Sequence, residues 1–166
     1  MKLEIESAAN FLIHLINLAK KDKYEIDAFK LLDLNLNIQG VLCKKFERAW
    51  SYEEPWLGTN YRALRINENL DGRLLEASLL SDIPPEEVHS RLPKDMIIWV
   101  DPGLVKICIN SFYWFDLYDL AKDLKSWTPT PPELKKQYKE DFDEMFLRHI
   151  CNNCCGNDDN CTHDGI

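Results

Sequence analysis

The sequence predicts an α+β fold in which an N-terminal helical pair packs, together with short helices, against a small antiparallel sheet. Apolar residues in the first fifty positions recur three or four apart, which is the helical period. The second half instead holds short apolar runs separated by turn residues. With 166 residues, 45% of them hydrophobic, the chain is long enough for one domain with its own core.

Two helices are expected first. Over residues 4–20, one apolar stripe is formed by Ile5, Ala8, Ala9, Leu12, Ile16 and Ala19. Residues 26–50 also show helical periodicity, but Gly40 and the nearby Asn35 and Asn37 argue against a continuous helix there. Two antiparallel helices joined by a short polar link are the simplest arrangement.

The pattern changes after residue 50. Residues 51–60 contain a proline and a glycine and are expected to form a loop. Over residues 61–66, apolar side chains alternate with the polar Arg62 and Arg65, which predicts a short strand.

Two short helices should follow this strand. Residues 71–80 are rich in leucine and begin with Asp71, a residue type that caps helices. A second helix is expected over residues 84–92, because two prolines and two glutamates suit a first helical turn and Pro93 suits the end.

The remaining strands are predicted over residues 96–100, 104–109 and 112–115, with turn residues at 101–103 and 110–111. Residues 1–118 would then form one domain. Residues 119–150 would be a proline-containing linker followed by a charged amphipathic helix, and residues 151–166 a flexible tail rich in Cys, Asn and Asp.

The net charge of −8, from 28 acidic and 20 basic residues, disfavours direct binding to nucleic acid or to an anionic membrane, both of which need clustered Lys and Arg. The longest unbroken apolar run has about five residues, far short of the ~20 that span a bilayer. The first residues lack the apolar stretch of a signal peptide, so a soluble intracellular protein is expected.

No catalytic motif is evident. The sequence lacks G-x-S-x-G, G-x-x-x-x-G-K-[ST], G-x-G-x-x-G and H-E-x-x-H patterns. Asp95 and Asp101 bracket the strand at 96–100 and would be a carboxylate pair, but such residues more often serve as turn and cap residues. A protein without enzymatic activity and without a cofactor is therefore expected.

The cysteine-rich tail allows one metal site. Cys-x-x-Cys is a spacing that suits zinc, and the candidate ligands are Cys151, Cys154, Cys161 and His163. The last two lie only one residue apart, which is closer than common zinc-finger spacings. A reduced tail without metal is the favoured interpretation, and zinc remains the alternative.

Two segments carry a family resemblance. Residues 46–67 contain a Trp, a Pro five residues on, a Gly and then Y-R-x-x-R-I-N, and residues 92–102 match L-P-x-x-x-x-x-W-V-D-P. They resemble box A and box B of the BTG/Tob anti-proliferative family, in the same order and at similar spacing. Residues 4–11 resemble the E-I-x-x-A-x-x-F pattern that opens the family's first helix.

This resemblance implies an α+β domain that acts as a monomeric adaptor in cytoplasm and nucleus. It would bind the catalytic subunit of the CCR–NOT deadenylase, promote shortening of mRNA poly(A) tails and restrain proliferation or drive differentiation. The family's contact positions fall on Tyr61, Asp71, Trp99 and Asp101. From the residues alone, Trp99 and Tyr61 would also suit packing, and Asp101 a turn.

Several alternatives stay open. The same surface would serve a transcriptional co-regulator that binds a nuclear factor, and an independent metal-dependent nuclease is a third, disfavoured class. The sequence also departs from the family pattern: Gly103 and Leu104 replace the usual aromatic and acidic pair, and Glu53 and Glu54 make box A more acidic. The segment at 112–119 does not match the family's contact site for poly(A)-binding protein.

Overall fold

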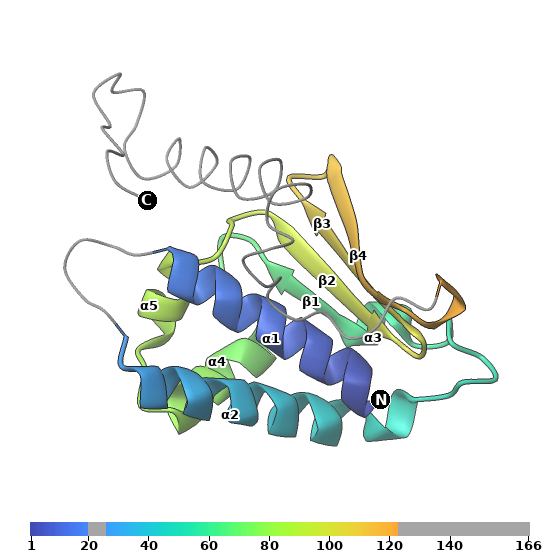
Figure 1. Ribbon diagram of the computed structural model, residues 1–166, viewed down its shortest axis with the longest axis horizontal. Coiled ribbons are helices and arrows are strands. Elements are labelled where there is room, and N and C mark those ends of the chain that lie inside the picture. The colour runs from blue at the N-terminus through green and yellow to red at the C-terminus, as the bar shows by residue number, and fades with distance from the viewer. Residues whose placement is uncertain (20–25, 123–166) are drawn as a thin grey trace, which may run out of the picture. The chain divides into compact units, whose positions relative to one another are not determined.

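The computed structural model describes residues 1–19 and 26–122 (Figure 1). In chain order its elements are α1 (Lys2–Leu18), α2 (Ala28–Phe46), the 3₁₀ turn η1 (Glu47–Ala49), α3 (Thr59–Arg62), β1 (Ala63–Ile66), α4 (Gly72–Leu80), α5 (Pro85–Ser90), β2 (Met96–Asp101), β3 (Leu104–Ile109), β4 (Tyr113–Asp119) and the 3₁₀ turn η2 (Leu120–Lys122). The α+β prediction is confirmed.

The strands form one antiparallel sheet in the order β1-β2-β3-β4. Ala63 of β1 lies opposite Trp99 of β2, which in turn lies opposite Lys106 of β3. The register between β3 and β4 shifts between Val105 and Lys106, so that Lys106 pairs with Asp116. Consecutive strands are neighbours throughout: short turns join β2, β3 and β4, whereas α4 and α5 lie between β1 and β2.

The helices cover one face of this sheet. In Figure 1, α1 lies against the sheet, where it contacts β2, β3 and β4, and α2 packs on α1, while α4 and α5 continue the helical layer. Along β2, Met96, Ile98 and Val100 are completely buried, whereas Ile97, Trp99 and Asp101 between them are only partly so. Because side chains alternate between the faces of a strand, Trp99 and Asp101 lie on the face turned away from the helices.

Helix α2 is continuous, although Gly40 and the asparagines argued against it. Asp27 caps its start by accepting a hydrogen bond from the backbone N–H of Phe29 at 2.8 Å. A Cβ at Gly40 would meet nothing within 4 Å, so this glycine costs only its intrinsic helix penalty of about 1 kcal/mol. Burial of Leu34, Ile38 and Leu42 against the core offsets that cost.

The strand predicted over residues 61–66 begins two residues late. Gly58 has a φ of 84°, and its carbonyl accepts the N–H groups of Tyr61 and Arg62, which closes the helical turn α3. Arg62 therefore does not point to solvent with Arg65: its exposed fraction is 0%. The alternating pattern extended the predicted strand into residues that belong to α3, because Gly58 lets the chain form a helical turn before the strand starts.

The other predictions for the described residues are largely confirmed. Asp71 caps α4, a proline opens α5, and turns lie at 102–103 and 110–111. The last strand is longer than predicted and ends at Asp119. Within 1–19 and 26–122, no helix is long and apolar enough to cross a membrane. The segment from residue 123 onward, which contains most of the linker and helix predicted over 119–150 and the whole tail at 151–166, lies outside the described residues.

Candidate protein-binding site

Arg62 organises the loop that follows α2. Its completely buried guanidinium donates hydrogen bonds to the carbonyl oxygens of Pro55 at 2.6 Å, Leu57 at 2.8 Å and Ala49. Three backbone acceptors around one planar cation fix the path of the loop, because the five N–H groups of arginine point in set directions. The loop is thus shaped by a single side chain from α3.

The same guanidinium joins this loop to the sheet. Nε and Nη2 of Arg62 donate to Oδ1 of Asp101 at 3.1 and 2.8 Å, and the Asp101 side chain is only 14% exposed. Asp101 ends β2, so the pair connects the end of that strand to residues 49–62. Both charges are shielded from water, and each therefore depends on the other.

Asp71 holds a second junction. Its Oδ1 accepts the backbone N–H and Nε of Arg73, and its Oδ2 accepts Nη2 of Arg73 and the N–H of Arg65. Arg73 also donates to the carbonyl oxygens of Tyr61 at 2.7 Å and Ala63 at 2.6 Å. Burial opposes ionisation of Asp71, but the hydrogen bonds and charge of Arg73 outweigh it and lower the pKa.

Glu4 on α1 connects the helical layer to box A and to the turn that follows β2. Its side chain is 2% exposed, and Oε1 accepts the hydroxyl of Tyr52 at 3.1 Å and the N–H of Gly103 at 3.0 Å. Burial would raise the pKa of Glu4, but hydrogen bonds from the N-terminal ammonium group and Gly103 lower it below its ordinary value. The turn after β2 is thereby fixed to the first helix.

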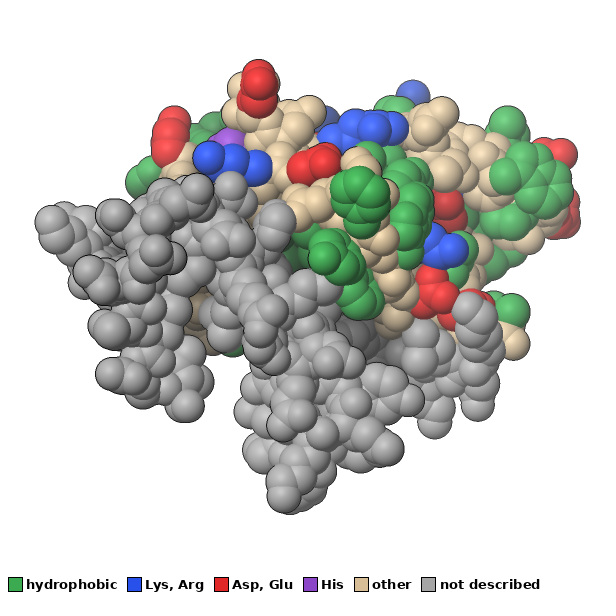
Figure 2. Space-filling model, turned by 90° about the horizontal axis from the view of Figure 1, so that it is seen from above, with side chains coloured by type: hydrophobic (Ala, Val, Ile, Leu, Met, Phe, Trp, Pro, Cys, Tyr) green, Lys and Arg blue, Asp and Glu red, His purple; other side chains and the backbone are tan. Residues whose placement is uncertain are grey.

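Two aromatic residues remain available on this framework. Tyr61 is 54% exposed; its hydroxyl donates to the carbonyl oxygen of Lys45 at 3.1 Å, and its ring meets Phe46 edge-on. Trp99 is half-buried, and its ring stacks on that of Trp114 with centroids 5.3 Å apart and planes at 11°. Seen from above, hydrophobic side chains gather beside basic and acidic ones (Figure 2).

All four residues predicted to contact a partner are therefore linked in the structure. Arg73 donates hydrogen bonds both to Asp71 and to the carbonyl oxygen of Tyr61. Arg62, which follows Tyr61 in the sequence, binds Asp101. Trp99 of β2 lies opposite Ala63 of β1. Their roles differ, however. Tyr61 and Trp99 offer ring surface to solvent, whereas both carboxylates are engaged by arginines inside the domain.

Sequence reasoning missed Arg62, Arg73 and Trp114. Arg62 stands in the Y-R-x-x-R-I-N motif, but alternation placed it in a strand. The pairing of Arg73 with Asp71 has one local signal in the sequence: Arg73 stands two residues after the aspartate that caps the helix. At that spacing the cap side chain can accept hydrogen bonds from the first helical turn. No sequence pattern predicts the stacking of Trp99 on Trp114, because it depends on the register of three strands.

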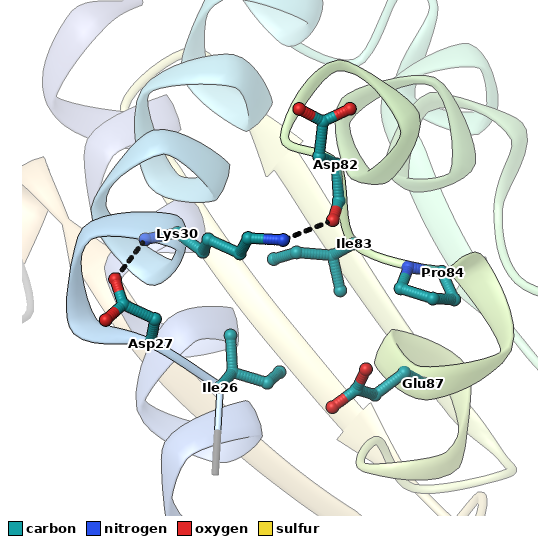
Figure 3. A pocket seen from close by; sticks show the side chains of 7 residues that line it. All are labelled: Ile26, Asp27, Lys30, Asp82, Ile83, Pro84 and Glu87. Carbon is teal, nitrogen blue, oxygen red and sulfur yellow. Dashed lines mark hydrogen bonds between the residues drawn. The ribbon is translucent and has the colours of Figure 1, made fainter. Parts of the chain in front are cut away.

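A shallow hollow elsewhere does not resemble a catalytic or anion site. About 240 Å³ in volume, it is lined by Ile26, Asp27, Lys30, Asp82, Ile83, Pro84 and Glu87 (Figure 3). The ammonium group of Lys30 already donates to the carbonyl oxygen of Asp82 at 2.8 Å, and the other charged side chains are carboxylates. An anionic ligand would meet repulsion there.

Within the described part of the chain, no cluster of three or more His, Cys, Asp or Glu residues is arranged to hold a metal ion. Asp95 and Asp101, the carboxylates that bracket β2, have separate partners: Ser111 hydroxyl donates to Asp95 at 3.3 Å, and Arg62 to Asp101. The zinc candidates Cys151, Cys154, Cys161 and His163 lie outside the described residues.

Comparison with known proteins agrees with this architecture. The family model described as "BTG family" matches residues 1–112, which contain both boxes. The chain belongs to the BTG family. The Tob1 protein of Homo sapiens is 33% identical to this BTG-family chain over 112 residues, covering 67% of the chain and 30% of Tob1. The Tob2 protein of Homo sapiens is 32% identical over the same length.

The BTG1 protein of Gallus gallus is 28% identical over 82 residues, which cover 49% of this chain and 48% of BTG1. This BTG-family chain thus matches less than a third of the length of the Tob proteins and about half of BTG1. Among solved structures, the BTG/Tob domain of C. elegans FOG-3 superposes with a TM-score of 0.62 at 20% identity, covering 74% of this chain and 95% of that one. The last likeness concerns the fold alone.

Proposed function

We propose that this BTG-family chain is a non-enzymatic, anti-proliferative adaptor that binds the catalytic subunit of the CCR–NOT deadenylase. By bringing that enzyme to messenger RNA it promotes shortening of poly(A) tails and so lowers expression of growth-promoting transcripts. It acts as a monomer in the cytoplasm and nucleus and contacts neither nucleic acid nor membrane directly. Tyr61 and Trp99 provide the contact, and Asp71 and Asp101 hold them in place.

The observation that carries this proposal is the Arg62–Asp101 pair. It makes the two boxes one rigid unit, beside which Tyr61 is exposed and Trp99 is half-buried. Tyrosine and tryptophan are the residue types that most often dominate binding energy, since they bury large areas while losing few torsions. An adaptor needs such a preorganised aromatic surface, whereas an enzyme needs convergent reactive groups.

The test is calorimetric titration of the full chain with a purified deadenylase catalytic subunit from the same source. The variant Trp99→Ala removes the half-buried ring without removing a charge from the framework. Phe29→Ala is the matched control, because Phe29 is 77% exposed on α2 and belongs to neither box. Circular dichroism of each variant verifies that it is folded.

We expect the wild-type chain to bind with a micromolar or smaller Kd. Trp99→Ala should weaken binding about tenfold or more, as loss of an aromatic hot spot does, and Phe29→Ala should change Kd by less than about twofold. Failure of the folded wild-type chain to bind would refute the deadenylase proposal. The co-regulator alternative would then be tested by identifying which nuclear factor the same surface retains.

A further inference from the structure

Trp114 occupies an unusual place on the sheet. It lies on β4, two strands away from Trp99, and its side chain is 56% exposed. Cys108 of β3 pairs with Trp114 and also with Ile97, while Trp99 pairs with Lys106. The two indole rings therefore meet diagonally across β3, nearly parallel and 5.3 Å apart. Their contact bridges three strands on the face turned away from the helices.

The core does not explain this residue. Leu117 and Tyr118 further along β4 are 4% and 6% exposed and anchor the strand, whereas more than half of Trp114 stays in solvent. Large exposed aromatic rings are unfavourable in water and are concentrated at binding sites. What Trp114 does achieve in the free protein is to hold the ring of Trp99 in one orientation by offset stacking.

That orientation has a consequence for binding. A half-exposed tryptophan without a neighbour would change rotamer freely, and binding would have to immobilise it. Stacking on Trp114 fixes the ring beforehand, so less conformational entropy is lost when a partner docks. The pair also presents a continuous apolar strip, bordered by the ion pair of Lys106 and Asp116, whose charged atoms are 3.6 Å apart.

We propose that Trp114 is a positioning and contact residue of the deadenylase-binding surface, acting chiefly through Trp99. This inference rests on the proposed function and deepens it: the surface around Trp99 on β2 extends across β3 to Trp114 on β4. The occupant is the deadenylase catalytic subunit, because Trp114 is in ring contact with the residue proposed as its main anchor.

The experiment compares the wild-type chain, the Trp99→Ala variant described above and four further variants of the full chain in calorimetric titrations with the purified deadenylase catalytic subunit. The four are Trp114→Ala, Trp114→Phe, the double variant Trp99→Ala with Trp114→Ala, and Phe112→Ala. Phe112 is the control because it is 83% exposed in the adjacent turn. Far-ultraviolet circular dichroism provides a second measurement, since two stacked indoles give an exciton couplet that the loss of either ring abolishes.

We expect Trp114→Ala to weaken binding about tenfold, Trp114→Phe to restore most of the affinity, and Phe112→Ala to change it less than about twofold. The double variant should bind little more weakly than Trp99→Ala alone, because residues that act as a unit are not additive. The exciton couplet should vanish in folded Trp114→Ala.

The inference is overturned if Trp114→Ala binds like the wild type while Trp99→Ala does not; the proposed function would then stand without it. Fully additive losses in the double variant would also contradict a role through Trp99. If the wild-type chain itself does not bind, the proposed function fails, and this extension fails with it.

Discussion

Arg62 and Asp101 lie 39 positions apart, yet two nitrogens of one completely buried guanidinium donate to a single carboxylate oxygen at 3.1 and 2.8 Å. Box A and box B are thereby one structural unit rather than two neighbouring motifs. An effect of an Asp101 substitution on binding cannot be attributed to lost contact until its effect on stability is known, because the same substitution leaves a buried cation without its counter-charge.

The first prediction concerns that pair. Asp101→Ala should lower the free energy of unfolding by about 3 kcal/mol, as breaking a buried ion pair from one side does. Lys45→Ala is the control, since Lys45 and Glu76 form a pair at 3.2 Å with side chains 43% and 42% exposed. The free energy of unfolding of Lys45→Ala should be lower than that of the wild type by less than about 1 kcal/mol. Urea unfolding measures both, and equal losses would refute the structural role of Asp101.

A second prediction separates the two jobs of Asp71, which caps α4 and binds Arg73. Asp71→Ala should lower the free energy of unfolding by about 2 kcal/mol. This value is at the upper end for loss of a helix cap, because Arg73 also loses its partner. Asp71→Asn keeps an acceptor for the backbone N–H and should cost less. Asp27→Ala is the matched comparison: Asp27 caps α2 by accepting hydrogen bonds from the backbone N–H groups of Phe29 and Lys30. Thermal unfolding ranks the three variants.

The third prediction follows from the lowered pKa values of Glu4 and Asp71. A carboxyl whose pKa is lower in the folded state binds protons more readily when unfolded. Its stabilisation is therefore complete above the unfolded pKa, near 4.5 for Glu4 and 3.8 for Asp71, and is lost as pH falls through the folded pKa. The free energy of unfolding should stay constant as the pH falls from neutral to these pKa values, and it should decrease at lower pH.

Glu4→Gln and Asp71→Asn test this assignment. Each variant should be less stable at neutral pH and should lose less stability on acidification than the wild type, because one of the responsible groups no longer titrates. Urea unfolding between neutral pH and about pH 3 provides the curves. An unchanged acid slope in both variants would assign the pH dependence to other carboxyl groups.

Local patterns predicted most elements, but they did not predict α3, the continuity of α2 or the junctions between elements. The helical stripe of α1, the Asp71 cap and the turn residues after β2 each express a rule that acts over a few residues. Arg62 follows no such rule: its burial depends on a turn at Gly58, on three carbonyl groups of the loop and on the end of a strand 39 residues away.

The candidate site shows the same division. Motif resemblance selected Tyr61, Asp71, Trp99 and Asp101, and the structure links all four. The resemblance did not indicate that arginines inside the domain bind both carboxylates, while the Tyr61 ring is exposed and the Trp99 ring half-buried, because a sequence motif carries no information on burial. The sequence did not predict the role of Trp114, because its stacking on Trp99 depends on the strand register, and that register shifts between Val105 and Lys106.

The last prediction isolates the ring of Tyr61 from its hydroxyl. Tyr61→Phe removes one exposed hydrogen bond, to the carbonyl oxygen of Lys45, and should cost no more than about 1 kcal/mol of stability. Because the ring remains against Phe46, deadenylase binding should stay within about twofold of wild type, whereas Tyr61→Ala should weaken it about tenfold. Titration calorimetry on folded variants decides this. Tight binding by Tyr61→Ala would exclude the ring from the contact surface, and equal losses in both variants would mean that the hydroxyl, not the ring, makes the contact.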